Sequence, residues 1–309
     1  MRILVVGAGA TGGYFGARLA QAGRDVSFLV RPRRAAELRE RGLRIVSPER
    51  TDTVASQLVT ADEITGPYDL VLLSVKAAAL AQAIEDLAPA VGPQTVILPF
   101  LNGMAHMDEL VARFGAHAVF GGVVKVFATV GDEGDIVQLA LTPPASIVFG
   151  ELDGDASERA EEVRRTLDVA GFTVDTSTDI VAAMWHKWSF ITTLGALTCL
   201  MRGPVGDIVE AGGGWLGPAI LAETAAVCAA AGHPLPDREI AATTAMVTEA
   251  GSSATSSAYR DLAGGRPVEV EHVFGDLVAR ARKLGADTPL LDLATLHLRV
   301  AQLRLAKER

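Results

Sequence analysis

Three glycines near the start of the chain, Gly7, Gly9 and Gly12, have the G-x-G-x-x-G spacing of a loop that binds the phosphates of a dinucleotide. Gly7 would allow a tight turn, Gly9 would let a pyrophosphate approach the backbone, and Gly12 would let a helix pack closely on a strand. The unpaired N–H groups at the start of that helix attract anions. We therefore expect Gly7, Gly9, Ala10, Thr11 and Gly12 to bind a dinucleotide cofactor.

The sequence around these glycines supplies the context that such a loop requires. Ile3–Val6 is four apolar residues long, which is typical of a buried parallel strand. The apolar pattern from Gly12 to Ala20 predicts an amphipathic helix. A strand followed by a helix favours dinucleotide binding over a glycine turn with a purely structural role.

A second strand, expected over Asp25–Val30, ends at Arg31, with Arg33 and Arg34 close behind. The end of this strand is where a dinucleotide-binding fold meets the adenosine ribose. An acidic residue there would bind the 2′-hydroxyl of NAD, whereas arginine suits the 2′-phosphate of NADP. The sequence thus favours NADP, with Arg31 as its contact. The alternative is a solvated basic turn that opens a helix over Arg33–Arg41.

Lys76 and Asn102 follow two further expected strands, Asp69–Val75 and Gln94–Phe100. Ligands of parallel sheets bind outside the carboxyl ends of the strands. We expect Lys76 and Asn102 to join the glycine loop there as cofactor contacts, although Asn102-Gly103 also suits an ordinary turn.

The alternation of strands and helices predicts an α/β fold, with an N-terminal Rossmann-type doubly wound sheet followed by an all-α C-terminal domain. Strand patterns end near residue 177, so we expect an NADP-binding domain over residues 1–177 and a helical substrate and catalytic domain over residues 178–309. Before that boundary we expect further, antiparallel strands over Ala118–Val130, Asp135–Leu141 and Ser146–Phe149, a helix over Glu158–Ala170 and a strand over Phe172–Asp175.

Lys187 stands between Trp185 and Trp188 in a helix expected over Asp179–Met201. Partial burial between tryptophans would lower the pKa of the lysine and make it a usable proton donor. The alternative is a lysine that packs its stem on apolar groups and keeps its ammonium in water.

Glu269 follows a turn at Gly264-Gly265 and a proline, Pro267, that suits the first position of a helix. It would then lie in the first helical turn, where capping alone could explain a carboxylate. Four serines precede this region, and a polar helix surface would be enough to explain them. They are Ser252, Ser253, Ser256 and Ser257.

Composition limits the classes of partner. The 309 residues carry 28 basic and 37 acidic side chains, and the net charge of -9 argues against nucleic-acid binding. The apolar stretches are too short to span a bilayer, so we expect a cytoplasmic protein without a membrane partner. Six scattered histidines and two cysteines without C-x-x-C spacing indicate no metal site. Apolar helices in the second domain are compatible with a homodimer.

Taken together, these motifs resemble the ketopantoate reductase (2-dehydropantoate 2-reductase) family. The matching segments are GAGATGG, SVKA, LNGM, WHKW, SSAYRDL and PVEVEHVFG. The resemblance implies NADPH-dependent reduction of a 2-oxo acid to a 2-hydroxy acid, namely 2-dehydropantoate to pantoate in pantothenate biosynthesis. It also implies a small-molecule 2-oxo acid as the ligand of the second domain.

The resemblance assigns roles to individual residues. Lys187 resembles the catalytic lysine of the family, and Glu269 resembles its active-site glutamate. Asn102 resembles the asparagine beside nicotinamide and substrate, and Ser257 resembles the serine that meets the substrate carboxylate. Arg31, like Lys76, looks like a cofactor contact.

Three positions depart from the family pattern. Ile191 and Gly195 stand where asparagines commonly follow the lysine by four and eight residues, and Phe274 replaces another asparagine. Lys187, Ile191 and Gly195 share one helix face, so we expect an apolar wall at Ile191 and an unfilled space at Gly195 beside the substrate. This face leaves open a reductase of a more apolar 2-oxo acid or ketone. A non-catalytic NADP-binding regulator is the alternative from another class.

Overall fold

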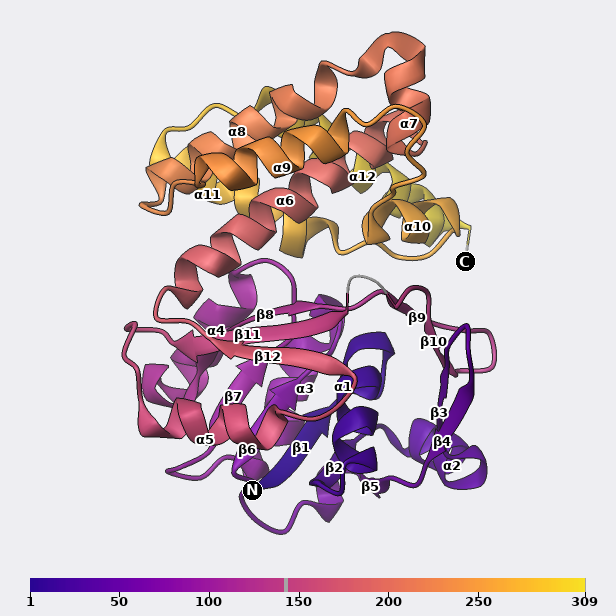
Figure 1. The fold of residues 1–309 in the computed structure, drawn as a ribbon, viewed down its shortest axis with the longest axis vertical. Helices are drawn as coiled ribbons and strands as arrows, with labels where there is room; N and C mark the ends of the chain where they lie inside the picture. Colours follow the sequence, from indigo (N-terminus) through magenta and orange to yellow (C-terminus); the bar gives the residue numbers. More distant parts are fainter. Residues whose placement is uncertain (142–143, 309) are drawn as a thin grey trace. The chain divides into compact units, whose positions relative to one another are not determined.

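The computed structural model describes residues 1–141 and 144–308. The chain divides into two compact units, the first made of residues 1–101 and 106–181, the second of residues 102–105 and 182–309. The first unit combines sheets and helices, whereas the second contains helices only (Figure 1). The expected α/β fold with an all-α C-terminal part is confirmed.

The central sheet of the first unit has five parallel strands in the order β5-β2-β1-β6-β7. The chain moves from β1 outward to β2 on one side and to β6 on the other, so the strand order reverses beside β1. Ligands of doubly wound sheets bind at such a reversal. The strands are β1 (Arg2–Val6), β2 (Asp25–Leu29), β5 (Gln57–Val59), β6 (Leu70–Leu73) and β7 (Val96–Pro99).

Helix α1 (Ala10–Gln21) packs on this sheet through Phe15, which is fully buried. The Phe15 ring lies 5.4 Å from that of Phe100 and 4.9 Å from that of Phe172. The sequence predicted that this helix starts at Gly12, but it begins two residues earlier, at Ala10. The other helices of this unit are α2 (Pro32–Arg41), α3 (Leu80–Leu87), α4 (Ala105–Phe114) and α5 (Glu158–Leu167), with short 3-10 turns η1 (Ala61–Glu63), η2 (Ala77–Ala79), η3 (Ala88–Ala90) and η4 (Ala116–Ala118).

Two smaller sheets complete the first unit, in the orders β4-β3-β10-β9 and β12-β11-β8. The pairs β8–β11 and β9–β10 are antiparallel, as expected, whereas β11–β12 and β3–β10 are parallel. The strands are β3 (Leu43–Val46), β4 (Thr51–Val54), β8 (Phe120–Lys125), β9 (Ala128–Val130), β10 (Ile136–Gln138), β11 (Ala145–Glu151) and β12 (Phe172–Thr176). After the antiparallel β3–β4 hairpin, the chain continues into β5, which pairs with β2 in the central sheet.

Helix α6 (Ile180–Met201) is the central helix of the second unit and is buried around most of its circumference. Two of its buried polar residues bond to a neighbouring helix. Ser189 Oγ and Thr193 Oγ1 lie 2.7 and 3.0 Å from Thr224 Oγ1 of α8 (Leu216–Ala230). The remaining elements are α7 (Val205–Ile208), the π-helical η5 (Val209–Gly213), α9 (Asp237–Val247), α10 (Ser257–Ala263), the π-helical η6 (Val270–Gly275), α11 (Asp276–Leu284) and α12 (Pro289–Lys307).

Among the described residues, no single helix is both long and apolar enough to cross a membrane. The bent pair Val205–Gly213 and Leu216–Ala230, which meets at 110°, passes on length and composition only when its two parts are taken together.

Candidate active site

In the glycine-rich loop between β1 and α1, neighbouring atoms crowd Gly7 and Gly12 but leave free space at Gly9. Gly7 has a φ of +97°, and a Cβ at this position would lie 2.5 Å from the carbonyl oxygen of Ser74. A Cβ on Gly12 would collide with the carbonyl oxygen of Gly7 and lie 2.7 Å from Ser74 Cβ. At Gly9, by contrast, no atom lies within 4 Å of the Cβ position. Packing therefore requires glycine at the first and third positions, and Gly9 borders open space.

This open space adjoins the N-terminus of α1. Gly9 is the N-cap residue in an extended conformation, and the first helical hydrogen bond runs from Gly13 N to Gly9 O at 2.8 Å. The N–H groups of Ala10, Thr11 and Gly12 consequently have no partner within the helix. No side chain caps the helix and no acidic residue lies in its first turn. The loop thus fits an anionic diphosphate.

Arg31 is the exposed N-cap residue of α2, two residues after the end of β2. Arg33 and Arg34 each bond to Glu37 at 3.1 Å, and Arg34 also donates to the Gly134 carbonyl at 2.6 Å. Within the described part of the chain, the Arg31 side chain has no such partner. Arg31 is therefore the arginine of this turn whose guanidinium is available to a ligand.

Lys76 is exposed at the carboxyl end of β6, where it precedes η2. It lies two residues after Ser74, whose carbonyl contacts the Gly7 position. The glycine loop and the Lys76 turn are thus neighbours at one edge of the central sheet.

In the second unit, two segments contact η6. The loop Asn102–Ala105 follows β7 but belongs to this unit. Its Gly103 has a φ of +77°, and a Cβ there would lie 2.7 Å from the carbonyl oxygen of His272. From α6, the indole nitrogen of Trp188 donates a hydrogen bond to the carbonyl oxygen of Val273 at 2.8 Å, and this bond is buried.

These contacts bring three predicted site residues into one neighbourhood. Asn102 precedes Gly103, Lys187 precedes Trp188, and Glu269 precedes η6. All three are partly buried. A polar site with an amide, an ammonium and a carboxylate can therefore form around η6, although these groups are up to 167 positions apart in the sequence.

The sequence predicted that Glu269 lies in the first turn of a helix, and this prediction is wrong. The helix begins at Val270, and Glu269 is its N-cap residue with non-helical dihedral angles of -77° and 58°. The Val270 N–H bonds to the Val268 carbonyl at 2.8 Å, and both valines are buried, so the backbone turns at Glu269. Its carboxylate makes no capping hydrogen bond. Capping therefore does not explain this residue.

The expected unfilled space at Gly195 is also wrong. A Cβ on Gly195 would lie 2.7 Å from Cζ and 3.2 Å from Cε1 of Phe274, whose ring is 1% exposed. The two departures from the family pattern compensate each other, because the ring occupies the room that glycine leaves. The sequence contained a signal for this contact. At one position of the family pattern asparagine is replaced by the larger Phe274, and at another it is replaced by Gly195, which has no side chain. Ile191, in contrast, is only partly buried on the same helix.

Ser257 is exposed as the first residue of α10, whereas the preceding Ser256 is buried. Ser256 Oγ accepts a hydrogen bond from the Tyr259 N–H at 2.9 Å and lies 2.9 Å from Thr198 Oγ1. Thr198 lies eleven residues after Lys187, or ~16 Å along α6 at 1.5 Å per residue. The described contacts thus bring Ser257 to α6, but not to the neighbourhood of Lys187. Ser256, which the sequence analysis did not single out, holds α10 in place.

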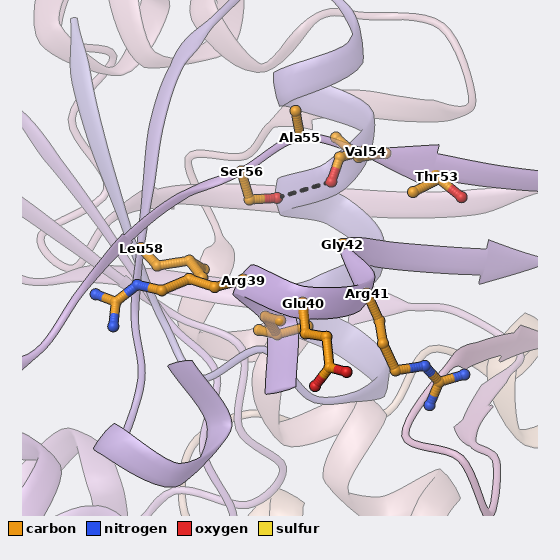
Figure 2. Close-up of a pocket in the computed structure, with 10 residues that line it drawn as sticks. Arg39, Glu40, Arg41, Gly42, Thr53, Val54, Ala55, Ser56 and Leu58 are labelled. Atoms are coloured by element: carbon orange, nitrogen blue, oxygen red, sulfur yellow. Dashed lines mark hydrogen bonds between the residues drawn. The ribbon is translucent and has the colours of Figure 1, made fainter. Parts of the chain in front are cut away.

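A depression of about 580 Å³ lies in the first unit, apart from the glycine loop (Figure 2). Figure 2 shows Arg39 and Arg41 pointing to opposite sides of it. It is at the C-terminal end of α2, whereas Arg31 is at the N-terminal end, ~15 Å away along a ten-residue helix. Its lining residues are Leu38, Arg39, Glu40, Arg41, Gly42, Thr53, Val54, Ala55, Ser56 and Leu58.

The parallel sheet, the open glycine loop at its strand reversal and the helical second unit define a Rossmann-type dinucleotide-binding protein. The chain belongs to the ketopantoate reductase family, because residues 3–154 match the family described as Ketopantoate reductase PanE/ApbA and residues 179–302 match its C-terminal part. It is therefore an oxidoreductase that acts on CH–OH groups, with a nicotinamide cofactor and a small-molecule substrate.

Several relatives align over nearly the whole chain. An uncharacterized oxidoreductase of Bacillus subtilis is 32% identical over 97% of this chain and 98% of its own length. The 2-dehydropantoate 2-reductase of Archaeoglobus fulgidus is 28% identical over 93% of this chain and 92% of its own. The crystal structure of the enzyme of that name from Geobacter metallireducens superposes with a TM-score of 0.87 at 29% identity, covering 97% of this chain and all of the other.

Proposed function

We propose that the protein reduces a 2-oxo acid to a 2-hydroxy acid with NADPH, and that 2-dehydropantoate, the substrate of pantothenate biosynthesis, is the first compound to test. The observation that carries this proposal is the meeting of the Asn102, Lys187 and Glu269 segments at η6. These three side chains provide a hydrogen-bonding amide, a cation and a carboxylate, which are the groups that carbonyl reduction needs.

The cofactor in this proposal is held by the first unit. The N–H groups of Ala10–Gly12 bind its diphosphate, and Gly9 leaves the backbone accessible. Arg31 and Lys76 provide the positive charges, with Arg31 on the 2′-phosphate. A bound reduced nicotinamide supplies the hydride that the carbonyl carbon receives.

The substrate residues then act on the carbonyl group and its neighbours. Lys187 stabilises the negative charge that grows on the keto oxygen and donates the proton to it. Glu269 orients Lys187 or binds a substrate hydroxyl, and Asn102 positions the carbonyl or the carboxamide of the cofactor. Ser257 is left out of this mechanism, because its neighbour Ser256 contacts Thr198, ~16 Å along α6 from Lys187, whereas the carboxylate of a 2-oxo acid is bonded directly to the carbonyl carbon.

The decisive experiment measures turnover and cofactor binding in Lys187→Ala and Glu269→Ala. We expect kcat to fall at least ~100-fold in each, since positioned proton transfer contributes ~100- to 10,000-fold. NADPH binding, followed by its fluorescence, should stay within about twofold because neither residue belongs to the glycine loop. Lys283→Ala, which removes an exposed lysine from α11, is the matched control. Unchanged turnover in Lys187→Ala would remove it as the proton donor.

Cofactor choice is tested at Arg31. In Arg31→Ala the KM for NADPH should rise ~10-fold or more while the KM for NADH stays unchanged, because only NADPH carries the 2′-phosphate. Arg33→Ala is the control, as that arginine is already paired with Glu37. An equal effect of Arg31→Ala on both cofactors would contradict the assignment.

A second candidate substrate class is favoured by Ile191, Gly195 and Phe274. These apolar residues stand where the family pattern has amides, and a site without such donors discriminates less for a substrate hydroxyl. We propose a more apolar 2-oxo acid or related ketone as this alternative. A panel of 2-oxo acids at fixed NADPH decides between the two. Ketopantoate as the clearly best substrate would exclude the apolar class.

The double variant Gly195→Asn/Phe274→Asn sharpens this test because it restores two amides without the collision between them. If the apolar residues set the preference, kcat/KM for 2-dehydropantoate relative to an apolar 2-oxo acid should rise ~10-fold or more. An unchanged ratio would show that these residues do not set specificity.

A further inference from the structure

The π-helical turn η6 is held by four contacts, one at each of four consecutive residues. Its Glu271 carboxylate forms a bidentate ion pair with Arg299 of α12, at 2.6 and 2.7 Å. The other three contacts join the His272 carbonyl to Gly103, the Val273 carbonyl to the Trp188 indole, and the Phe274 ring to Gly195. Turns of this rare kind occur often at functional sites. The position of η6 is therefore fixed both by the loop that carries Asn102 and by the helix that carries Lys187.

Of these four contacts, the bond from Trp188 is the directional one that joins α6 to the backbone of η6. The indole nitrogen donates to the Val273 carbonyl oxygen at 2.8 Å, and the Trp188 side chain is 1% exposed. A hydrogen bond weakens steeply when its angle changes, whereas the packing of Phe274 on Gly195 depends mainly on distance. The Trp188 bond therefore sets the rotation of α6 about its own axis relative to η6.

This rotation decides where the Lys187 side chain points. Successive residues of an α-helix are ~100° apart around its axis, so the direction of Trp188 fixes that of its neighbour Lys187. Gly195 follows Trp188 by seven positions, almost two full turns, and contacts η6 from the same side of α6. Trp188 and Gly195 thus hold the helix against η6 at two points ~10 Å apart along its axis.

The indole ring of Trp188 is itself held in place. The ring of Trp185 lies 5.2 Å from it, and the Arg280 guanidinium carbon lies 5.9 Å from its centroid, within the range of a cation–π contact. Arg280 is held in turn by Asp276 of the same helix, since both carboxylate oxygens lie 3.1 Å from its Nε. The Trp188 side chain is therefore a rigid connection between α6 and η6.

We propose that Trp188 is a positioning residue for carbonyl reduction, an inference that rests on the proposed function. Its indole N–H holds the backbone of η6, and thereby the placement of Lys187 on α6 relative to Glu269, which directly precedes η6. Groups that act on a substrate must stay within about 0.5 Å of their productive geometry, and a misplacement of ~1 Å can lower the rate ~100-fold. Trp188 should therefore affect kcat and not the binding of substrate or cofactor.

The variant Trp188→Phe tests the proposal, because phenylalanine keeps an aromatic ring but lacks the donor. With the best 2-oxo acid of the panel, kcat should fall ~10-fold or more, while the KM values for the acid and for NADPH should stay within about twofold. Tyr259→Phe is the matched control and should keep the wild-type kcat. It also removes a hydrogen bond from an aromatic side chain to a backbone carbonyl, that of Arg202 at 3.2 Å, but this bond does not involve η6. An unchanged kcat in Trp188→Phe would overturn the proposal.

Replacing Trp188 by the benzothiophene analogue of tryptophan separates the hydrogen bond from the packing. The analogue has sulfur in place of the N–H group and nearly the same shape, so it fills the core even if Trp188→Phe does not fold. Circular dichroism checks the fold of both proteins. The analogue should reproduce the fall in kcat, and a wild-type kcat in this protein would overturn the role of the N–H group.

A double-mutant cycle with Lys187→Ala distinguishes positioning from general support of the fold. If Trp188 acts through Lys187, Trp188→Phe should change the residual kcat of Lys187→Ala by less than about twofold. A similar ~10-fold fall in both backgrounds would show that Trp188 does not act through Lys187 and would overturn the proposal. By contrast, a wild-type kcat in Lys187→Ala would contradict the proposed function itself, and this inference would fail with it.

Discussion

The contact between Gly195 and Phe274 predicts that Gly195→Ala destabilises the protein, although it removes a glycine from the middle of a helix. The added Cβ would lie 2.7 Å from Phe274 Cζ. Carbon atoms ordinarily pack ~3.5–4.0 Å apart, so the ring would have to withdraw by about 1 Å. The ring is 1% exposed and has no solvent to move into.

The size of the effect follows from two opposing terms. Crowding a well-packed core by one methyl group costs about 1–3 kcal/mol. Replacing glycine by alanine inside a helix returns about 1 kcal/mol. The net loss in the free energy of unfolding should therefore be roughly 0–2 kcal/mol, where an uncrowded helix position would gain about 1 kcal/mol.

A double-mutant cycle with Phe274→Leu isolates the contact. Leucine lacks the outer ring atoms that crowd position 195, so Gly195→Ala should become neutral or stabilising in that background. Urea denaturation, followed by circular dichroism, measures the free energy of unfolding of all four proteins. If Gly195→Ala stabilises the wild-type background by about 1 kcal/mol and the two changes are additive, the ring does not occupy the space and the reasoning fails.

Three further predictions concern packing and charge. The Arg18 guanidinium beside Asp52 lowers the pKa of that carboxyl below its ordinary value of 3.8. The ionised Asp52 carboxylate should stabilise the folded protein fully above about pH 4. This stabilisation should be lost as the pH falls through the depressed pKa of Asp52 in the folded protein. Cys199 and Cys228 should not react with a thiol reagent at pH 8 in the native state, because burial raises their pKa values to about 12. Glu151→Ala should lower the free energy of unfolding by ~1–3 kcal/mol, since the nearly buried carboxylate accepts three hydrogen bonds.

Each of these has a measurement that can contradict it. Urea denaturation of wild type and Asp52→Asn from pH 2 to pH 7 should show a difference that disappears toward low pH, and a constant difference would exclude the ion pair as its cause. Reaction of either thiol before unfolding would contradict the burial of Cys199 and Cys228. Glu158→Ala is the control for Glu151→Ala, because it removes a neighbouring carboxylate from the start of α5. Equal losses from the two changes would contradict the role of the Glu151 hydrogen bonds.

The sequence by itself determined the local elements and the residue types of the site. Apolar runs such as Ile3–Val6 can be buried on both faces, so they predict parallel strands, and the spacing of Gly7, Gly9 and Gly12 predicts the phosphate loop. The strand and the loop are predicted from residues that are close in the sequence, whereas the close approach of Ser74 to Gly7 and Gly12 is a tertiary contact that agrees with the prediction. The predicted start of α1 was less accurate than its predicted existence, because the start depends on the extended conformation of one residue, Gly9.

Only the tertiary structure decided how distant segments fill one another's space. From the sequence, Gly195 left a gap and Glu269 lay in a helical turn. In the structure, the Phe274 ring fills that gap, and the buried neighbours of Glu269 turn the backbone before the helix begins. Packing is a relation between residues far apart in the chain, whereas periodicity and capping are relations between near ones.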